Sequence, residues 1–394
     1  MRVIGIDVVR SAAIFFAMFS HIYADIELGH YMSPDMALPL RVVLQTATPI
    51  FVLLFGTMLE LVYFPKWVSG KRQMVTSRLL KRALQCWILY ALSIFCLFLV
   101  DDGYSWKFSI SCLIFMGNSP YTEILKFYAV ALLLTPLLLR LRERAGLWPL
   151  VVLALSYQAA WPFLHALPDA YDDLGAPLQI ARLIKFLTGF GNRSLMGPSV
   201  LHGLSLVIFG LCLGRFISQG RDGKTTGQDT GSTRSAAFAR KIAAGLVVSL
   251  ALTLAGALTV PDAVFRGLAN MSLRLNSSVI YFAAGTLSAV SLTLALIWIV
   301  DVWAPIRSTV WHSVSFFGRT SMFTFAWGNM LLYLLDYRPT NAVSAYGTAG
   351  LLLAAICLMS FCFDRAMRRS RRAGALLEMI NRPLDRLTRL SIRP

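Results

Sequence analysis

The sequence predicts an all-α protein, a polytopic integral membrane bundle of about ten transmembrane helices. Of its 394 residues, 57% are hydrophobic and only 14% are charged, whereas about a quarter of the residues in a soluble domain are charged. The mean hydropathy is +0.63, and apolar runs long enough to cross a bilayer recur along the chain. These ten runs cover residues 4–24, 39–64, 83–100, 123–140, 147–165, 199–217, 241–260, 278–300, 313–335 and 344–363.

Basic residues are distributed unevenly between the two sets of loops that ten spans create. With an even number of spans, both termini lie on one side of the membrane. The segments on that side hold 26 of the 37 lysine and arginine residues, and those on the other side hold nine. Because these residues are enriched in cytoplasmic loops, we predict that both termini are cytoplasmic. The formal net charge of +17 then reflects topology, and no nucleic-acid partner is expected.

Composition divides the chain into four parts. Residues 1–217 carry the first six spans, and residues 241–365 carry the last four. Between them, residues 218–240 are rich in Gly, Ser, Thr and charge, which is typical of a flexible linker, here cytoplasmic. Residues 366–394 form a basic, partly amphipathic tail that we expect to lie on the anionic inner leaflet.

The first apolar run contains an acid, a base and an imidazole, namely Asp7, Arg10 and His21. In an α-helix, the eleven residues from Arg10 to His21 give a net rotation of about 20° over roughly 16 Å, so both side chains share a face with Asp7. Ionisable groups are costly in hydrocarbon and usually line a cavity or a pathway. The alternative is that Asp7 and Arg10 are interfacial anchors and that His21 lies at the level of the headgroups.

Other polar groups accompany later spans. Arg78, Lys81 and Arg82 cluster on one side of a helix, where guanidinium groups can bind phosphate. The alternative is that they are ordinary flanking charges of the cytoplasmic side. Arg319 and Asn329 lie within the ninth run and are expected to face the bundle interior, either as a polar clamp between helices or as part of a site.

The segments predicted to face outward are rich in acidic and aromatic residues. Such residues suit sugar recognition, and an aromatic belt at the bilayer surface explains them equally well. They are Asp25, Glu27, Asp101, Asp102, Asp169, Asp172, Asp173, Tyr23, Tyr31, Tyr104, Trp106, Trp161 and Tyr171. The six cysteines lack the spacing of metal ligands or of a disulfide framework, so no metal site is expected. Walker, Rossmann, HExxH and GxSxG motifs are also missing from the sequence.

The motif of the first helix resembles that of the membrane-bound acyltransferase 3 superfamily, whose first helix carries Asp-x-x-Arg and then Arg-x10-His. Asp7, Arg10 and His21 stand at these positions. Residues 121–128, which include Glu123, and Gly318-Arg319-Thr320-Ser321 are similar to the branch that contains the periplasmic-glucan succinyltransferases (the OpgC type). Other superfamily members carry a histidine some ten residues after this glycine, in the penultimate span, where the present chain has Gly328.

The resemblance implies a transferase of the inner membrane of a Gram-negative bacterium. It would move a succinyl or acetyl group from cytoplasmic succinyl-CoA or acetyl-CoA, a co-substrate rather than a bound cofactor, to a glycan hydroxyl at the periplasmic side. His21 would be the general base, because imidazole titrates near neutral pH, while Asp7 and Arg10 would orient the helix and bind the donor. The residues expected to bind substrates are Arg78, Lys81, Arg82, Glu123, Arg319 and Ser321.

Two other classes of protein remain open. A glycan or lipid transporter would also place polar groups in spans, although transporters more often have internal repeats and broken helices, and neither is evident in the sequence. The other class is a structural partner in an envelope-polysaccharide complex. Release of free CoA from acyl-CoA by the purified protein would distinguish the enzyme from both. The sequence does not indicate the oligomeric state.

Overall fold

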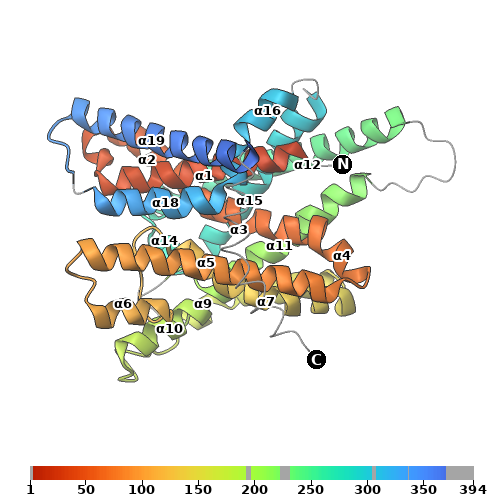
Figure 1. The fold of residues 1–394 in the computed structure, drawn as a ribbon. Helices are drawn as coiled ribbons and strands as arrows, with labels where there is room; N and C mark the ends of the chain where they lie inside the picture. The colour runs from red at the N-terminus through yellow and green to blue at the C-terminus, as the bar shows by residue number, and fades with distance from the viewer. Residues whose placement is uncertain (1–2, 192–196, 222–230, 304–307, 336, 370–394) are drawn as a thin grey trace.

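The computed structural model describes residues 3–191, 197–221, 231–303, 308–335 and 337–369, and every regular element among them is a helix (Figure 1). The all-α prediction is therefore confirmed for this part of the chain. The elements are α1 (Ile4–Asp25), η1 (Leu28–Tyr31), α2 (Pro34–Gln45), α3 (Ala47–Met58), η2 (Leu59–Tyr63), α4 (Phe64–Val68), α5 (Arg72–Val100), α6 (Trp106–Leu113), α7 (Glu123–Ala145), α8 (Trp148–Ala159), α9 (Trp161–His165), α10 (Leu178–Thr188), α11 (Val200–Arg221), α12 (Gly231–Thr259), α13 (Asp262–Ala269), α14 (Ser272–Leu275), α15 (Val279–Ile297), η3 (Trp298–Trp303), α16 (Ser308–Val314), α17 (Phe316–Arg319), α18 (Ser321–Leu334) and α19 (Ala342–Arg369).

Among the described residues, eight helical segments are long and apolar enough to cross a membrane. They begin with α1, the α2–α4 segment, α5, α7 and α11, and continue with α12, α15 with η3, and α19. The other two predicted spans are not single long helices. Residues 147–165 form α8, of twelve residues, and the short α9, which has a proline in its first turn. Residues 313–335 are divided among α16, α17 and α18.

The ninth segment is interrupted where it packs against α1. A side chain at Gly318 of α17 would place its Cβ 2.5 Å from the Asp7 carbonyl oxygen, so this close approach requires glycine. The Gly318 amide donates to the Ser11 hydroxyl of α1 at 2.8 Å. Interrupted backbone at membrane depth is tolerated where protein buries it, as it buries Gly318. No sign of this break is evident in the sequence, and the expectation of an unbroken helix is wrong here.

Contacts between the connecting segments place them at two ends of the bundle. We call them the His21 end and the Asp7 end, after the two ends of α1. Contacts at the His21 end are Tyr121–Asp25, Tyr31–Pro339 and Trp161–Asn276, and those at the Asp7 end are Ile4–Asp301, Arg142–Glu60 and Arg319–Asp364. The loops predicted to face outward therefore share the His21 end. Which end faces the cytoplasm stays a prediction.

Helix α1 lies against helices from both parts of the chain. It contacts α2 and α3 as well as α15, α17, α18 and α19, and its Val9, Ala13 and Met18 are fully buried. The Asp301 carboxylate accepts hydrogen bonds from the Ile4 amide at 2.9 Å and the Gly5 amide at 2.8 Å. These amides lie in the first turn and have no partner within the helix, so Asp301 caps α1. Its negative charge also interacts favourably with the positive end of the helix dipole.

Figure 1 shows α1, α2, α18 and α19 on one side of the bundle and α5, α7 and α10 on the other, with α3, α11 and α15 between them. Helices α12 and α19 are the most exposed spans, with 11% and 22% of their apolar windows buried, as expected for helices that face lipid. Helix α11 runs to Arg221 and α12 begins at Gly231, so both reach into the predicted linker 218–240. Its residues 222–230 and the tail from 370 to 394 lie outside the described residues.

Candidate functional site

His21, near the end of α1, is half-buried and oriented by α18. Its Nδ1 lies 2.7 Å from Oδ1 of the buried Asn329, whose Nδ2 donates to the Phe325 carbonyl at 2.8 Å. A carbonyl oxygen only accepts, so the amide nitrogen of Asn329 must face Phe325 and its oxygen must face His21. That oxygen requires a hydrogen on Nδ1. A neutral His21 therefore carries its lone pair on Nε2, the form that a general base needs.

Aromatic rings hold the His21 imidazole on two sides. Tyr121, in the turn before α7, stacks on it with ring centroids 4.8 Å apart, and Phe325 meets it edge-on at 5.6 Å. The Tyr121 hydroxyl donates to Oδ1 of Asp25 at 3.3 Å. Burial and the Asp25 carboxylate raise the pKa of Tyr121, so this hydroxyl stays protonated and keeps donating. Within the described part of the chain, no group forms a hydrogen bond with Nε2 of His21.

Glu123 supports the turn that carries Tyr121. Its Oε1 accepts from the Ser119 amide at 2.9 Å, and its Oε2 lies 2.5 Å from Nζ of the buried Lys126. The Lys126 ammonium also donates to the Gly117 carbonyl at 3.1 Å. The carboxylate predicted to bind substrate is thus already paired, and it fixes the turn whose tyrosine stacks on His21.

A polar face of α2 covers the residue before His21. The Arg41 guanidinium donates to the Ser20 hydroxyl at 3.4 Å, and the Gln45 amide donates to the same hydroxyl at 3.5 Å. Arg41 also lies over the Tyr23 ring, 4.9 Å from its centroid. Arg41 is not among the site residues predicted from the sequence, although an arginine inside an apolar run is a usable signal.

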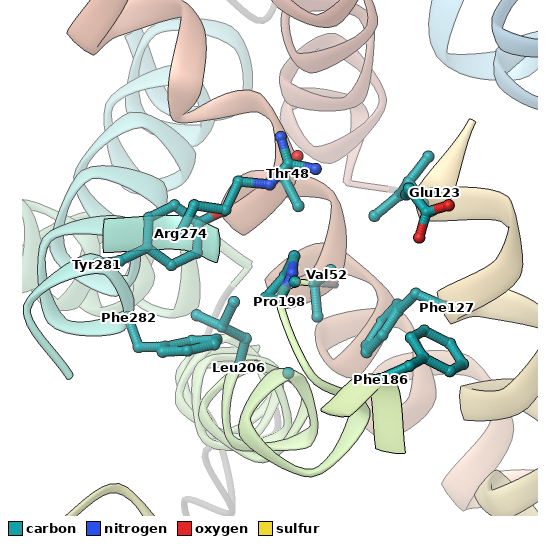
Figure 2. Close-up of a pocket in the computed structure, with 13 residues that line it drawn as sticks. Thr48, Val52, Glu123, Phe127, Phe186, Pro198, Leu206, Arg274, Tyr281 and Phe282 are labelled. Carbon is teal, nitrogen blue, oxygen red and sulfur yellow. The ribbon is translucent and has the colours of Figure 1, made fainter. Parts of the chain in front are cut away.

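A pocket is lined by residues of α3, α7, α10, α11, α14 and α15 and of the segment before α11. In Figure 2, Arg274 reaches toward Thr48 at one end, and Glu123 stands on the other side. The remaining labelled residues are Val52, Phe127, Phe186, Pro198, Leu206, Tyr281 and Phe282, which are mostly apolar. Among the described residues, no group of three or more His, Cys, Asp or Glu side chains could hold a metal ion.

The pocket adjoins His21 through two helix starts. Glu123 follows Tyr121, which stacks on His21, by two residues. Thr48 follows Gln45, which bonds Ser20, by three residues. The imidazole and the pocket thus share the same flanking segments.

Asp7 and Arg10 lie at the other end of α1, against α17. Both are half-buried, and a Cβ at Gly318 would lie 2.5 Å from the Asp7 carbonyl oxygen and 3.2 Å from the Arg10 Cβ. The rise of a helix places Arg10 about 16 Å along the axis from His21. These two residues are therefore not beside the imidazole.

Arg319 forms a clamp between α17 and α19. Its Nε and Nη2 donate to the two carboxylate oxygens of Asp364 at 3.0 and 2.8 Å, and its Nη1 donates to the Ser315 hydroxyl. The forked geometry is the strong form of an arginine–carboxylate pair. The Asp364 carboxylate, held by Arg319, keeps α19 against the interrupted ninth segment.

The basic cluster on α5 lies close to the start of α18. Arg78 and Arg82 are exposed and Lys81 is half-buried, and the Arg82 guanidinium lies 3.4 Å from the Met322 sulfur, next to Ser321. The predicted site residues thus fall into two groups. His21 and Glu123 lie at the His21 end, and the other group, toward the Asp7 end, comprises Asp7, Arg10, Arg78, Lys81, Arg82, Arg319 and Ser321.

Comparison with known families bears on members of both groups. Residues 2–169 match the family model for heparan-alpha-glucosaminide N-acetyltransferase, catalytic. This chain is similar to a family of membrane acyltransferases. The match runs from α1 to just beyond α9, so it includes His21 and the α5 cluster but not Asn329. No curated protein matches the chain. Membership of the acyltransferase 3 superfamily and of its succinyltransferase branch stays a prediction.

Proposed function

We propose that this chain moves an acyl group, acetyl or succinyl, from cytoplasmic acyl-CoA to a glycan hydroxyl, with His21 as the general base. The observation that carries the proposal is the hydrogen-bond chain from the Phe325 carbonyl through Asn329 to Nδ1 of His21, because it leaves Nε2 as the proton acceptor. The similarity of residues 2–169 to an acyltransferase family supports the type of reaction.

The chemistry needs only one shuttled proton. The glycan hydroxyl would give its proton to Nε2 of His21 while its oxygen attacks the thioester carbonyl carbon. The carbon–sulfur bond then breaks, and the imidazolium returns the proton to the departing sulfur. Free CoA and the acyl ester result, and the imidazole is restored. Asn329 would hold the imidazolium in place, as the third member of a catalytic triad does.

The second group of residues suits the acyl donor. Arg78 and Arg82 are exposed cations near the start of α18, and arginine binds phosphate by paired hydrogen bonds. Arg10, which belongs to the same group, lies about 16 Å along the axis of α1 from His21, and this distance is comparable with an extended pantetheine arm. The nucleotide of CoA would stay at a cytoplasmic Asp7 end while the thioester reaches His21, where an acceptor enters from the periplasm of the bacterial inner membrane.

An amine is the second candidate for the acceptor. The matching family is named for an N-acetyltransferase of a glucosaminide, and a base at Nε2 would take a proton from an attacking amine as well as from a hydroxyl. The products would be an amide and free CoA. Assays with a neutral glucan and with a glucosamine-containing oligosaccharide would separate the two acceptors.

The decisive experiment measures release of free CoA by the purified full-length protein in nanodiscs, with acetyl-CoA or succinyl-CoA and each acceptor. We expect His21→Ala to lower the rate of acyl transfer by about 10²- to 10⁴-fold. Abundance in the membrane should not change, because the imidazole is half-buried.

His30→Ala is the matched control, since His30 is exposed at the same end of the bundle. Its rate of transfer should equal that of the unsubstituted protein. Acyl transfer by His21→Ala above about a tenth of the normal rate would rule out general-base catalysis by this residue. If the unsubstituted protein releases no CoA with any donor, a transporter or a structural partner becomes the better description.

A further inference from the structure

Arg274 is a cation in a largely apolar pocket and has no carboxylate partner within the described part of the chain. Its Nε is buried without a hydrogen bond, and its Nη1 approaches the Met271 sulfur at 3.7 Å, which is a weak contact. A cation removed from water is costly unless an anion pairs with it. Its guanidinium reaches into the pocket toward Thr48 (Figure 2), so an anion in the pocket could supply the missing partner.

Glu123, on the other side of the pocket, is not that partner. Both of its oxygens are engaged, one by the Ser119 amide at 2.9 Å and the other by the Lys126 ammonium at 2.5 Å. Its charge is therefore balanced locally. An anionic ligand near Arg274 would face a neutralised carboxylate rather than a free one.

A second unpaired arginine lies nearby. Arg41 contacts the Ser20 hydroxyl and the face of Tyr23, which are both neutral, and no carboxylate pairs with it in the described ranges. Arg41 and Thr48 are seven residues apart, or two helical turns, on the α2–α3 segment. Arg41 therefore lies on the face of this segment that meets Ser20, and Arg274, from α14, reaches Thr48 on the same face.

From this pair we infer that Arg41 and Arg274 form a subsite beside His21 that binds a carboxylate group of the substrate. Arginine presents a planar fork of donors that matches a carboxylate, and weak hydration makes it the better cation for a partly buried pair. The inference rests on the proposed acyl transfer. The carboxylate could belong to a dicarboxylic acyl group, such as succinyl, or to an acidic sugar of the acceptor.

Two assays separate these sources. In the donor assay, succinyl-CoA is compared with butyryl-CoA, which has a methyl group in place of the carboxylate, on a neutral glucan. In the acceptor assay, acetyl-CoA is used with a glucuronate-containing oligosaccharide and with a glucose oligosaccharide of equal length. The subsite requires the unsubstituted protein to prefer the carboxylate in one assay, and that assay identifies the source.

Arg274→Gln and Arg41→Gln should each reduce kcat/KM for the carboxylate substrate by about ten- to a hundredfold, the range expected for one charge-assisted hydrogen bond. The kcat/KM of the neutral analogue should change about twofold at most. Arg274→Lys should retain an intermediate preference, because an ammonium keeps the charge and loses the fork. Arg266→Gln, at an exposed arginine of α13 at the same end, should leave both substrates unaffected.

Equal losses for charged and neutral substrates would show that the arginines only support the fold, and equal use of both by the unsubstituted protein would also overturn the subsite. If no acyl-CoA is turned over, the proposed function fails, and the subsite is tested by binding alone. Succinate should then raise the thermal midpoint of the unsubstituted protein but not of Arg274→Gln, and uncharged succinamide should raise neither. No rise with succinate would overturn the subsite as well.

Discussion

At the scale of single residues, the orientation of the Asn329 amide sets the tautomer of His21. The Phe325 carbonyl fixes which way the amide points, and the amide fixes which imidazole nitrogen carries the proton. A buried polar group in an apolar helix is costly unless it is satisfied. Asn329 uses its oxygen and its nitrogen for this one purpose, so we regard it as a positioning residue.

Substitutions at Asn329 test this role. Asn329→Ala should lower kcat by about 10²-fold or more, because the imidazole loses the acceptor that sets its tautomer. Asn329→Asp keeps an acceptor for Nδ1 and should recover much of the rate. The KM for acyl-CoA should change little in either variant, since Asn329 contacts the imidazole rather than the donor.

The control is the amount of folded protein, measured by size-exclusion chromatography of each variant. A residue that only packs the helices would lower the yield and would not distinguish alanine from aspartate in kcat. Equal kcat values for the alanine and aspartate variants at equal yield would contradict the positioning role.

Residues that are close in the sequence were the ones that sequence patterns could group. The spacing of Arg10 and His21 predicts a shared helix face because helical geometry is local. The contact of His21 with Tyr121 depends instead on how α7 packs, and that of Arg274 with the pocket depends on a short helix before α15. Neither contact has a local pattern in the sequence.

At the scale of helices, the interrupted ninth segment depends on close packing at Gly318. Gly318→Ala would place a methyl group 2.5 Å from the Asp7 carbonyl oxygen, which is backbone and cannot move aside alone. We expect a loss of about 1–3 kcal/mol in the free energy of unfolding, as for other overpacked sites. The thermal midpoint in detergent is the measurement.

Gly347→Ala provides the comparison. Gly347 lies in α19, and a Cβ there would meet no atom within 4 Å. Alanine is a better helix former than glycine by roughly 0.5–1 kcal/mol, so this variant should be as stable as the unsubstituted protein or more so. If Gly318→Ala behaves like Gly347→Ala, close packing does not explain the break between α17 and α18.

The hydropathy of residues 313–335 indicates an apolar run, but hydropathy contains no information on where the helix in that run is interrupted. The break depends on contacts with Asp7 and Ser11, about 300 residues away in the sequence. The eight long helices were predictable because their length and composition are properties of each segment alone.

At the scale of the whole molecule, contacts place the connecting segments at two ends. Reporter fusions after residues 25, 105, 171 and 262 should therefore all give the same result. With the 26-to-9 division of basic residues, that result should be periplasmic. Fusions to alkaline phosphatase and to a cytoplasmic fluorescent reporter measure on which side of the membrane each position lies. Two or more fusions that report the cytoplasm would show that the predicted orientation or the number of crossings is wrong.

The pairing of α1 with α18 also bears on how function can be inherited between proteins. The region that matches a known family ends at residue 169, and the residue that orients His21 lies 160 positions further on, at Asn329. A shorter protein could keep the whole matched region and still have an imidazole with no fixed tautomer. Relatives that retain the histidine should therefore be compared by whether their helix equivalent to α18 carries a hydrogen-bond acceptor for its Nδ1. A match to the first half alone would not identify a competent enzyme.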